Sequence, residues 1–335
     1  MLLSVLMVCV LVSVSTSTSV FNPDDPWETW KDFHGKTYST QDEEKLRLKV
    51  WLQNVMKVTN HNVDFKLGKS SFSLALNYLA DLTDEEFSNM YFGIKPSEEE
   101  IEDEGTVLVE EELMSKRPIP QSIDWRNTDR VTHVKNQKNC GSCYAFSALG
   151  AIEGQLTKHG LPLTSLSEQQ IVDCAKGFGT YSCFGGRPIG VFKYIRKYGI
   201  MSQKSYPYKG KKQTCRYNQQ LVVKKIQRFT HVRPKTEAAL AKAVATIGPI
   251  SVLVTSDTPD FRHYRKGILF DTGCTSRKPT DHGMLLVGFG EQHGKKYWIL
   301  KNSWGNRWGD NGYVYLARDR GNHCKITSSA IYPVL

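Results

Sequence analysis

Residues 137–147, Gln-Lys-Asn-Cys-Gly-Ser-Cys-Tyr-Ala-Phe-Ser, decide the fold and the chemistry that we expect of this chain. The second cysteine, Cys143, opens an apolar stretch that runs to Leu156 and is typical of a long buried helix. A helix N-terminus carries a partial positive charge, which stabilises a thiolate and lowers the pKa of a thiol. A free cysteine at position 143 is therefore predicted to be reactive.

The Cys-x-x-Cys spacing of Cys140 and Cys143 has two other interpretations. A thioredoxin-type redox pair would need a preceding strand–helix pattern, which the sequence lacks. Half of a zinc site would need a second close pair, and the other cysteines are isolated. We therefore predict no metal and no other cofactor.

The number of cysteines gives Cys143 more weight. Residues Leu2–Val14 form an apolar run followed by small residues, which predicts a signal peptide cleaved near Ser17–Ser19 and removes Cys9. Seven cysteines remain in an oxidising compartment, so one is free or pairs with another molecule. The run is too short to span a bilayer, and no later stretch is suitable, so no membrane span is predicted.

Charge divides the chain near Arg117. Residues 1–117 contain 11 basic and 21 acidic residues, a net charge of −10, which leaves 44 − 11 = 33 basic and 34 − 21 = 13 acidic residues, or +20, from Pro118 onward. The halves either attract one another or are unrelated solvated surfaces. The basic half predicts polyanions as partners, but no recognisable module predicts nucleic acid. The Glu-rich, aromatic-poor residues 95–116 are typical of an exposed linker, which places a domain boundary at residue 117.

Periodicity predicts an α+β protein with two lobes. Residues 26–62 have helical spacing, and Thr83–Glu86 is a capping box that opens another helix. Strands are predicted at residues 250–255, 284–289, 296–301 and 312–317. Helices first and strands later indicate two lobes, and a site between them is expected.

A thiolate nucleophile needs an imidazole, and His282 is the best candidate. It lies in Thr-Asp-His-Gly, residues 280–283, directly before an apolar strand. A lone histidine there is more often a turn residue. Asn302, within Lys-Asn-Ser-Trp-Gly at 301–305, is placed to orient the ring, and Trp304 to screen that hydrogen bond from water.

These motifs, in this order, resemble the papain family of cysteine proteases, especially its cathepsin L, K and S branch. The spaced residues Glu43 to Asn62 resemble the family's inhibitory propeptide helix, and Ala75 to Asp81 its second propeptide motif. The resemblance implies a two-lobed papain-like fold, with a helical left lobe and a β-barrel-like right lobe. It also implies a signal peptide (1–19), an inhibitory propeptide with an acidic linker (20–117) and a peptidase domain (118–335).

By resemblance the chain is a cysteine endopeptidase made as a zymogen, with Cys143 as nucleophile, His282 as proton carrier and Asn302 orienting His282. Gln137 and the Cys143 N–H would form the oxyanion hole. The residues implied in substrate binding are Gly185, Gly186, Arg187, Pro188, Leu253, Thr280, Asp281, Trp304 and Ser329. The implied disulfides are Cys140–Cys183, Cys174–Cys215 and Cys274–Cys324.

The same resemblance suggests that Gly186 bonds the substrate backbone, where a side chain would obstruct it, and that a medium apolar pocket accepts the P2 residue. Two residues depart from the family pattern: Tyr144 where Trp is usual, and Lys138 where Gly is usual. The expected partners are protein substrates and the chain's own propeptide, and a monomer in the lysosome or outside the cell is expected. The rival class is a catalytically silent binding homologue.

Overall fold

The computed structural model describes residues 25–94, 118–274 and 279–335. The predicted signal peptide, with Cys9, and the predicted acidic linker lie outside the described residues. The chain divides into two units, residues 1–48 and 49–335, which we describe separately. None of the described helices has the length and apolar character needed to cross a membrane.

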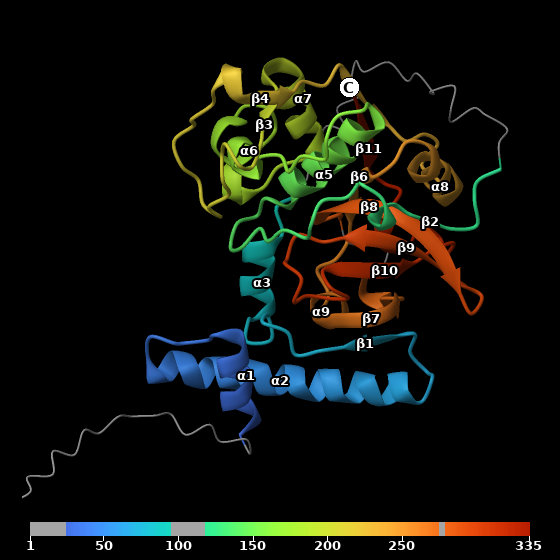
Figure 1. Ribbon diagram of the computed structural model, residues 1–335. Helices are drawn as coiled ribbons and strands as arrows, with labels where there is room; N and C mark the ends of the chain where they lie inside the picture. Colours follow the sequence, from blue (N-terminus) through green and yellow to red (C-terminus); the bar gives the residue numbers. More distant parts are fainter. Residues whose placement is uncertain (1–24, 95–117, 275–278) are drawn as a thin grey trace, which may run out of the picture. The chain divides into compact units, whose positions relative to one another are not determined.

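The first unit contains α1 (Pro26–His34) and the beginning of α2 (Gln41–Lys66) (Figure 1). Asp25 caps α1 by accepting a hydrogen bond from the Trp27 N–H at 2.9 Å. Gly35 ends the helix in the left-handed conformation, with φ +62°. The predicted helical stretch over residues 26–62 is therefore two helices.

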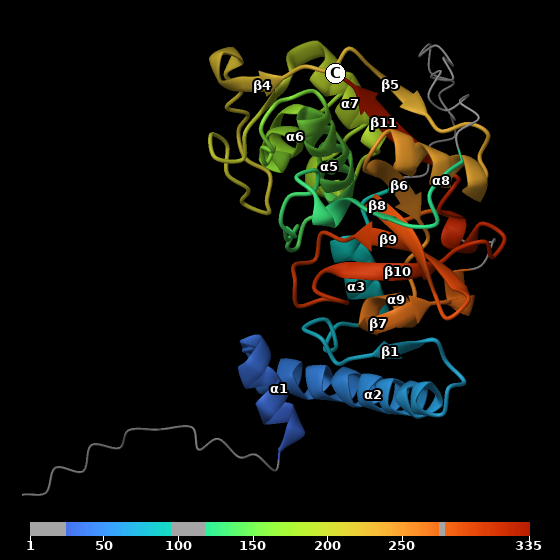
Figure 2. The same cartoon turned by 45° about the vertical axis from the view of Figure 1, so that its right-hand side comes forward.

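The second unit begins within α2, whose later turns bury Val50, Trp51, Asn54 and Val58. The chain then forms β1 (Phe72–Leu74), which pairs antiparallel with β7 (Tyr264–Leu269) (Figure 2). The helix α3 (Asp84–Tyr91) follows and has the predicted capping box between Thr83 and Glu86. We call residues 49–94 the N-terminal segment.

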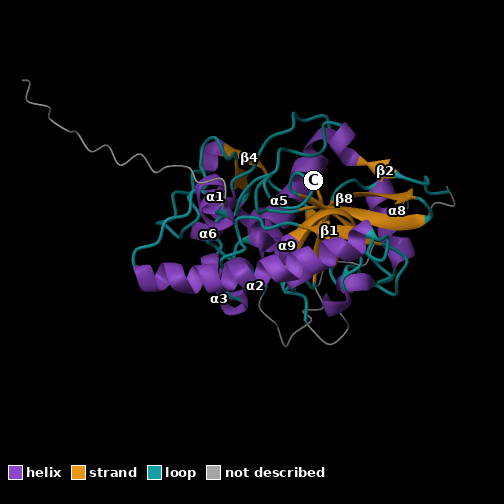
Figure 3. Ribbon diagram, turned by 90° about the horizontal axis from the view of Figure 1, so that it is seen from below, coloured by secondary structure: helices purple, strands orange, loops and turns teal. Residues whose placement is uncertain are grey.

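One hydrophobic core of this unit is mainly helical. It surrounds α5 (Cys143–Lys158), whose buried apolar residues include Leu149 and Ile152. The other helices and strands around it are α6 (Glu168–Cys174), α7 (Pro188–Tyr198), β3 (Ile200–Met201) and β4 (Val222–Lys224). Figure 3 shows α5 beside the orange strands of the larger sheet.

The other core is built on a nine-stranded sheet in the order β1-β7-β10-β9-β8-β6-β11-β5, with β2 paired to β8. The remaining strands are β2 (Ile123–Asp124), β5 (Arg228–His231), β6 (Ile250–Val254), β8 (His282–Gln292), β9 (Lys295–Lys301), β10 (Tyr313–Ala317) and β11 (Ala330–Val334), with α8 (Glu237–Thr246) and α9 (Pro259–His263) beside them. All four strands predicted from alternation are present. The α+β class is confirmed.

Helix α5 packs against this sheet, and that contact places Cys143. The Ser147 hydroxyl on α5 donates to the Met284 carbonyl of β8 at 2.6 Å. Gly150 allows the close approach, because a Cβ there would lie 2.7 Å from a Leu285 methyl group. At the start of α5, the Cys143 carbonyl oxygen would lie 3.1 Å from a Cβ on Gly283 of β8. The first residue of α5 and the first residues of β8 therefore meet.

Candidate active site

Cys143 is a free, fully buried thiol at the first position of α5. The other described cysteines form the bridges Cys140–Cys183, Cys174–Cys215 and Cys274–Cys324, the same three pairs that the family resemblance implies. His323 approaches the third bridge, but both sulfurs there are already bonded to each other. The bridges are typical of the oxidising secretory pathway.

His282 begins β8 and is oriented by Asn302, which follows β9. Its Nε2–H donates to the Asn302 Oδ1 at 2.8 Å, and the Ser303 N–H donates to the same oxygen at 2.8 Å. The amide oxygen can only accept, so Nδ1 carries the free lone pair of the ring. Nδ1 is buried and makes no hydrogen bond. Trp304 covers the ring, with centroids 4.9 Å apart.

Both titratable groups are held neutral in this structure. Burial raises the pKa of the Cys143 thiol to about 11, although the backbone N–H groups of Gly283 and Gly93 favour the thiolate. Burial likewise lowers the pKa of His282 to about 4 against the opposing effect of Asn302. The sequence predicted a lowered thiol pKa, and in this structure that prediction is wrong. The helix N-terminus is present, but desolvation outweighs it.

The Gln137 side chain is fully buried, and hydrogen bonds fix its amide. Its Oε1 accepts from the Ser303 hydroxyl at 2.6 Å, so its Nε2 faces the opposite way. Nε2 donates to the carbonyls of Cys140 at 3.0 Å and Tyr91 at 3.2 Å. Ser303 lies inside the Asn-Ser-Trp-Gly motif, but the motif gives no signal of this contact with Gln137. Its contact joins residues 166 positions apart.

The backbone of the N-terminal segment passes through the site, and the centroid of the Phe92 ring lies 6.0 Å from that of His282. The Gly93 carbonyl accepts from the Gly186 N–H at 2.6 Å. A Cβ on Gly93 would lie 1.9 Å from the Gly141 oxygen, and one on Gly185 would lie 2.2 Å from the Gly93 oxygen. Gly186 thus bonds a passing backbone, but a side chain there would meet Tyr144 and Thr180 instead. The residue at which a side chain would obstruct the approach is Gly185.

The remaining residues implied in substrate binding come from both cores. Leu253 on β6 donates its N–H to the Ser329 carbonyl at 3.0 Å. Thr280 and Asp281 precede His282, and burial raises the pKa of Asp281 to about 6 against hydrogen bonds from Ser256 and Asp257. Arg187 and Pro188 lie at the start of α7, in the helical core.

Both departures from the family pattern are accommodated. Tyr144 is fully buried, and its hydroxyl donates to the Ser182 carbonyl at 2.9 Å. Burial raises its pKa well above the usual value, so the phenol keeps its proton. Lys138 has φ +54°, the left-handed conformation that favours glycine.

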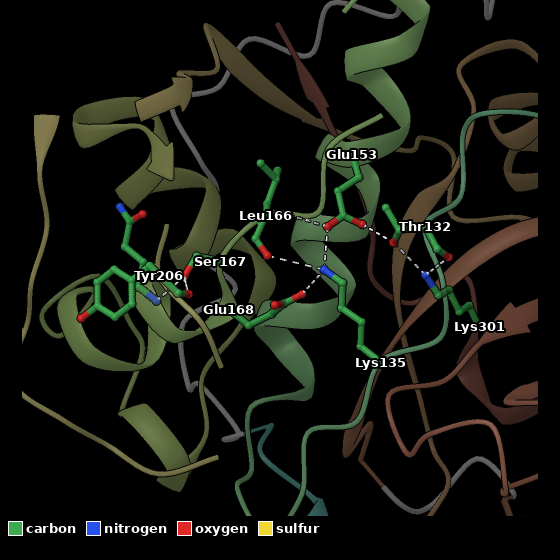
Figure 4. A network of polar contacts seen from close by, with 9 residues as sticks. Thr132, Lys135, Glu153, Leu166, Ser167, Glu168, Tyr206 and Lys301 are labelled. Carbon is green, nitrogen blue, oxygen red and sulfur yellow. Dashed lines mark hydrogen bonds and ion pairs between the residues drawn. The ribbon is translucent and has the colours of Figure 1, made fainter. Parts of the chain in front are cut away.

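A buried charge cluster, which the sequence analysis did not anticipate, connects the segments that carry these residues (Figure 4). The Lys135 ammonium lies 2.7 Å from Glu153 and 2.6 Å from Glu168. Thr132 connects Glu153 to the Lys301 ammonium by hydrogen bonds of 2.7 and 3.1 Å. Lys135 precedes Gln137 by two residues, Glu153 lies on α5, and Lys301 directly precedes Asn302. We call these four charged residues the ion cluster.

Comparison with known proteins agrees with this geometry. Residues 119–334 match the model of the papain family cysteine protease, and residues 27–87 match the cathepsin propeptide inhibitor domain. The chain is 40% identical to human cathepsin L2 over 99% of both chains, and 42% identical to mouse procathepsin L over 92% of this chain and 91% of that one.

Among solved structures, the digestive procathepsin L2 proteinase of Tenebrio molitor matches with a TM-score of 0.86 and 34% identity, over 92% of this chain and 98% of that one. The N-terminal segment described above thus belongs to an inhibitory propeptide. The chain belongs to the papain family of cysteine proteases, as a cathepsin L-like endopeptidase synthesised as a zymogen with its own inhibitory propeptide.

Proposed function

We propose that Cys143, His282, Asn302 and Gln137 are the catalytic residues of this endopeptidase. The observation that carries the proposal is the oriented imidazole: Nε2 is bonded to Asn302 at 2.8 Å, and Nδ1 is left without a partner at the start of a strand that meets Cys143. A ring held in this way offers one nitrogen for proton exchange with the thiol.

In the proposed reaction, the Cys143 sulfur attacks the scissile carbonyl carbon after its proton has passed to His282. The carbonyl oxygen becomes negative and is stabilised by the Gln137 amide and the Cys143 N–H. The C–N bond breaks, His282 gives its proton to the departing amine, and a thioester remains. Water then attacks the thioester, His282 takes the water proton, and the thiolate leaves the acid product.

The test uses the processed protein and a dipeptidyl fluorogenic amide. We expect hydrolysis that is lost on Cys143→Ala and strongly reduced on His282→Ala, while Cys274 and the other bridged cysteines stay unreactive toward iodoacetamide. Equal turnover by the Cys143→Ala variant would end the proposal.

We further propose that Leu253, Thr280, Ser329, Arg187 and Pro188 line the pocket for the P2 side chain, and that Gly185, Gly186, Asp281 and Trp304 lie along the substrate backbone. An apolar wall of this size favours Leu or Val, or Pro, at P2, and one methylene changes the preference by about 10–200-fold. A P2 substrate library tests this, and a preference for Asp or Glu over Leu would contradict it.

Processing is proposed to remove residues 1–19 and then 20–117, leaving residues 118–335 as the active, monomeric enzyme. Acid pH should speed the second step by protonating carboxylates of the propeptide, and polyanions should assist it by binding the basic domain. N-terminal sequencing of the products tests the boundaries. Neutralising Glu98–Glu104 and Glu110–Glu112 without changing the pH dependence of processing would refute the acidic mechanism.

The destination within or beyond the secretory pathway is proposed to be the lysosome or the extracellular space. The sequence has no Asn-x-Ser/Thr site for a glycan, so delivery to lysosomes would need a receptor that reads protein surface. Fractionation of cells expressing the full chain tests this, and accumulation in the endoplasmic reticulum would contradict it.

A further inference from the structure

Lys138 puts a positive charge directly beside the oxyanion glutamine. Its backbone is left-handed, which costs a residue with a Cβ on the order of 1 kcal/mol, and its N–H is held by the Asn136 side chain at 2.8 Å. Its Cα is about 3.8 Å from that of Gln137, as for any neighbours in sequence. The side chain is exposed. The chain therefore keeps a strained lysine within one residue of the reacting groups.

A second loop, residues 209–212, packs against the Lys138 side chain and carries three more lysines. The Lys138 side chain packs on Gly210, with its Cδ 2.9 Å from where a Cβ on Gly210 would lie. Buried Gln169 fixes this loop by accepting from the Lys209 N–H at 2.7 Å and donating to the Lys211 carbonyl at 2.9 Å. Lys138, Lys209, Lys211 and Lys212 form what we call the lysine cluster.

The charge of the lysine cluster is not balanced by ion pairs within the part of the chain that the structure describes. All four side chains are exposed, and none makes an ion pair with a described carboxylate. The nearby Asp173 is buried and already accepts hydrogen bonds from Tyr206 and Gln213. Four like charges on two fixed loops produce a local positive potential that attracts acidic groups.

The propeptide backbone shows which part of a substrate would reach this cluster. Tyr91 bonds Gln137, and Gly93, two residues later, bonds Gly186. Under the proposed function, a substrate bonds Gly186 before the scissile carbonyl and meets Gln137 at that carbonyl. The residues after the scissile bond therefore leave at the Gln137 end of this track, where Lys138 lies.

We propose that the lysine cluster selects substrates with acidic side chains directly after the scissile bond. This inference depends on the catalytic assignment proposed above. Each exposed charge pair contributes about a two- to fivefold preference, so two or three acidic side chains give a preference of about tenfold at low salt. The preference should decrease with added salt, because the cluster is solvent-exposed.

The test compares two internally quenched peptides that share Leu at P2 and differ after the scissile bond, Glu-Glu-Asp against Gln-Gln-Asn. The measured quantity is the ratio of their kcat/KM values with the self-processed full chain. We expect a ratio of about ten at low salt, falling toward one in Lys138→Asn, which keeps a residue tolerant of left-handed backbone. The ratio should also fall in the triple variant Lys209→Ser, Lys211→Ser, Lys212→Ser.

The matched control removes two positive charges elsewhere, by Lys295→Ser with Arg320→Ser, and should keep the ratio of the unsubstituted enzyme. A ratio near one in the unsubstituted enzyme, or one that survives both lysine variants, overturns the inference. If dextran sulfate binds the lysine cluster but the two peptides are cleaved at equal rates, the cluster binds polyanions without selecting substrates, and the inference is overturned. Hydrolysis of a dipeptidyl amide, which has no residues after the scissile bond, is measured in parallel. If it is absent from the unsubstituted enzyme, the catalytic assignment fails and this inference fails with it.

Discussion

Two buried polar sites lie close together in this protein, and one is neutral whereas the other is charged. The Cys143 thiol and the His282 imidazole are neutral, because burial shifts each pKa away from its charged form. In the ion cluster, burial also opposes charge, but Glu153 and Glu168 outweigh it at Lys135, whose pKa is raised. Lys135 and Lys301 likewise outweigh burial at Glu153, whose pKa is lowered.

The difference shows that depth alone does not decide ionisation. The Lys135 ammonium is held 2.7 Å from Glu153 and 2.6 Å from Glu168 by parts of the peptidase domain itself. Opposite charges do not offset burial at every residue of the ion cluster: burial raises the pKa of Glu168 and lowers that of Lys301 to about 8. The Cys143–His282 pair, in contrast, is covered by the propeptide. Removal of the propeptide therefore ends the burial of this pair, whereas the ion cluster stays buried in the peptidase domain.

The largest expected effect is on the thiol when the propeptide is removed. With a pKa of about 11, Cys143 stays protonated below that pH, and alkylation of the zymogen by iodoacetamide should rise about tenfold per pH unit up to it. Once water reaches the sulfur, the helix N-terminus and imidazole should bring the pKa to about 7.5 or lower. Labelling at pH 7 should then increase about a thousandfold. Superimposable pH profiles for zymogen and processed enzyme would contradict the comparison.

Removing the positive charge of Lys135 should leave buried, unpaired carboxylates in the ion cluster and destabilise the fold. Lys135→Met leaves Glu153 and Glu168 without their shared partner and should cost about 3–5 kcal/mol in the free energy of unfolding at pH 7. The loss should shrink at acid pH, where carboxyls are neutral. Urea unfolding in a Cys143→Ala background measures it. Lys296→Met, which breaks an exposed 2.9 Å pair with Asp319, is the control and should cost less than about 1 kcal/mol. Equal losses would refute the argument.

A methyl group on the propeptide should loosen the cover over Cys143 and His282. Gly93→Ala would place a Cβ against the Gly141 oxygen, and overpacking of this kind costs about 1–3 kcal/mol. The zymogen should therefore label with a thiol probe at pH 7 about 5–150-fold faster. Gly68→Ala meets no atom within 4 Å, but at φ +73° it strains the propeptide backbone away from the site. It therefore tests general weakening of the propeptide and should change the rate little. Unchanged labelling of the Gly93→Ala zymogen would show that the fit is looser than described.

The smallest expected effect concerns Lys138, the strained residue that follows Gln137. Lys138→Gly should remove the cost of left-handed backbone and raise the free energy of unfolding by up to about 1 kcal/mol. Lys209→Gly removes the same charge at a residue without positive φ and should give no gain. Thermal unfolding of both variants decides, and destabilisation by Lys138→Gly would contradict the assignment of strain.

Local patterns were enough to predict much of the fold. The capping box at Thr83 and the start of α5 at Cys143 depend on residues within a few positions, so short-range rules predicted them. Sequence motifs also selected His282 and Asn302, which the structure joins at 2.8 Å by pairing β8 with β9. The disulfide pairs followed only from resemblance, because a cysteine count permits many pairings.

Sequence by itself therefore selected the residues that we propose for the chemistry and predicted many of the helices and strands, because these follow from residue type and local periodicity. Tertiary structure alone decided that the thiol is neutral, that Ser303 fixes Gln137 and that Gly185 rather than Gly186 admits a passing backbone. The physical reason is that desolvation and close contact depend on which distant segment covers a group. Residues 91–93 cover the Cys143 thiol, although they lie some fifty positions before it in the chain.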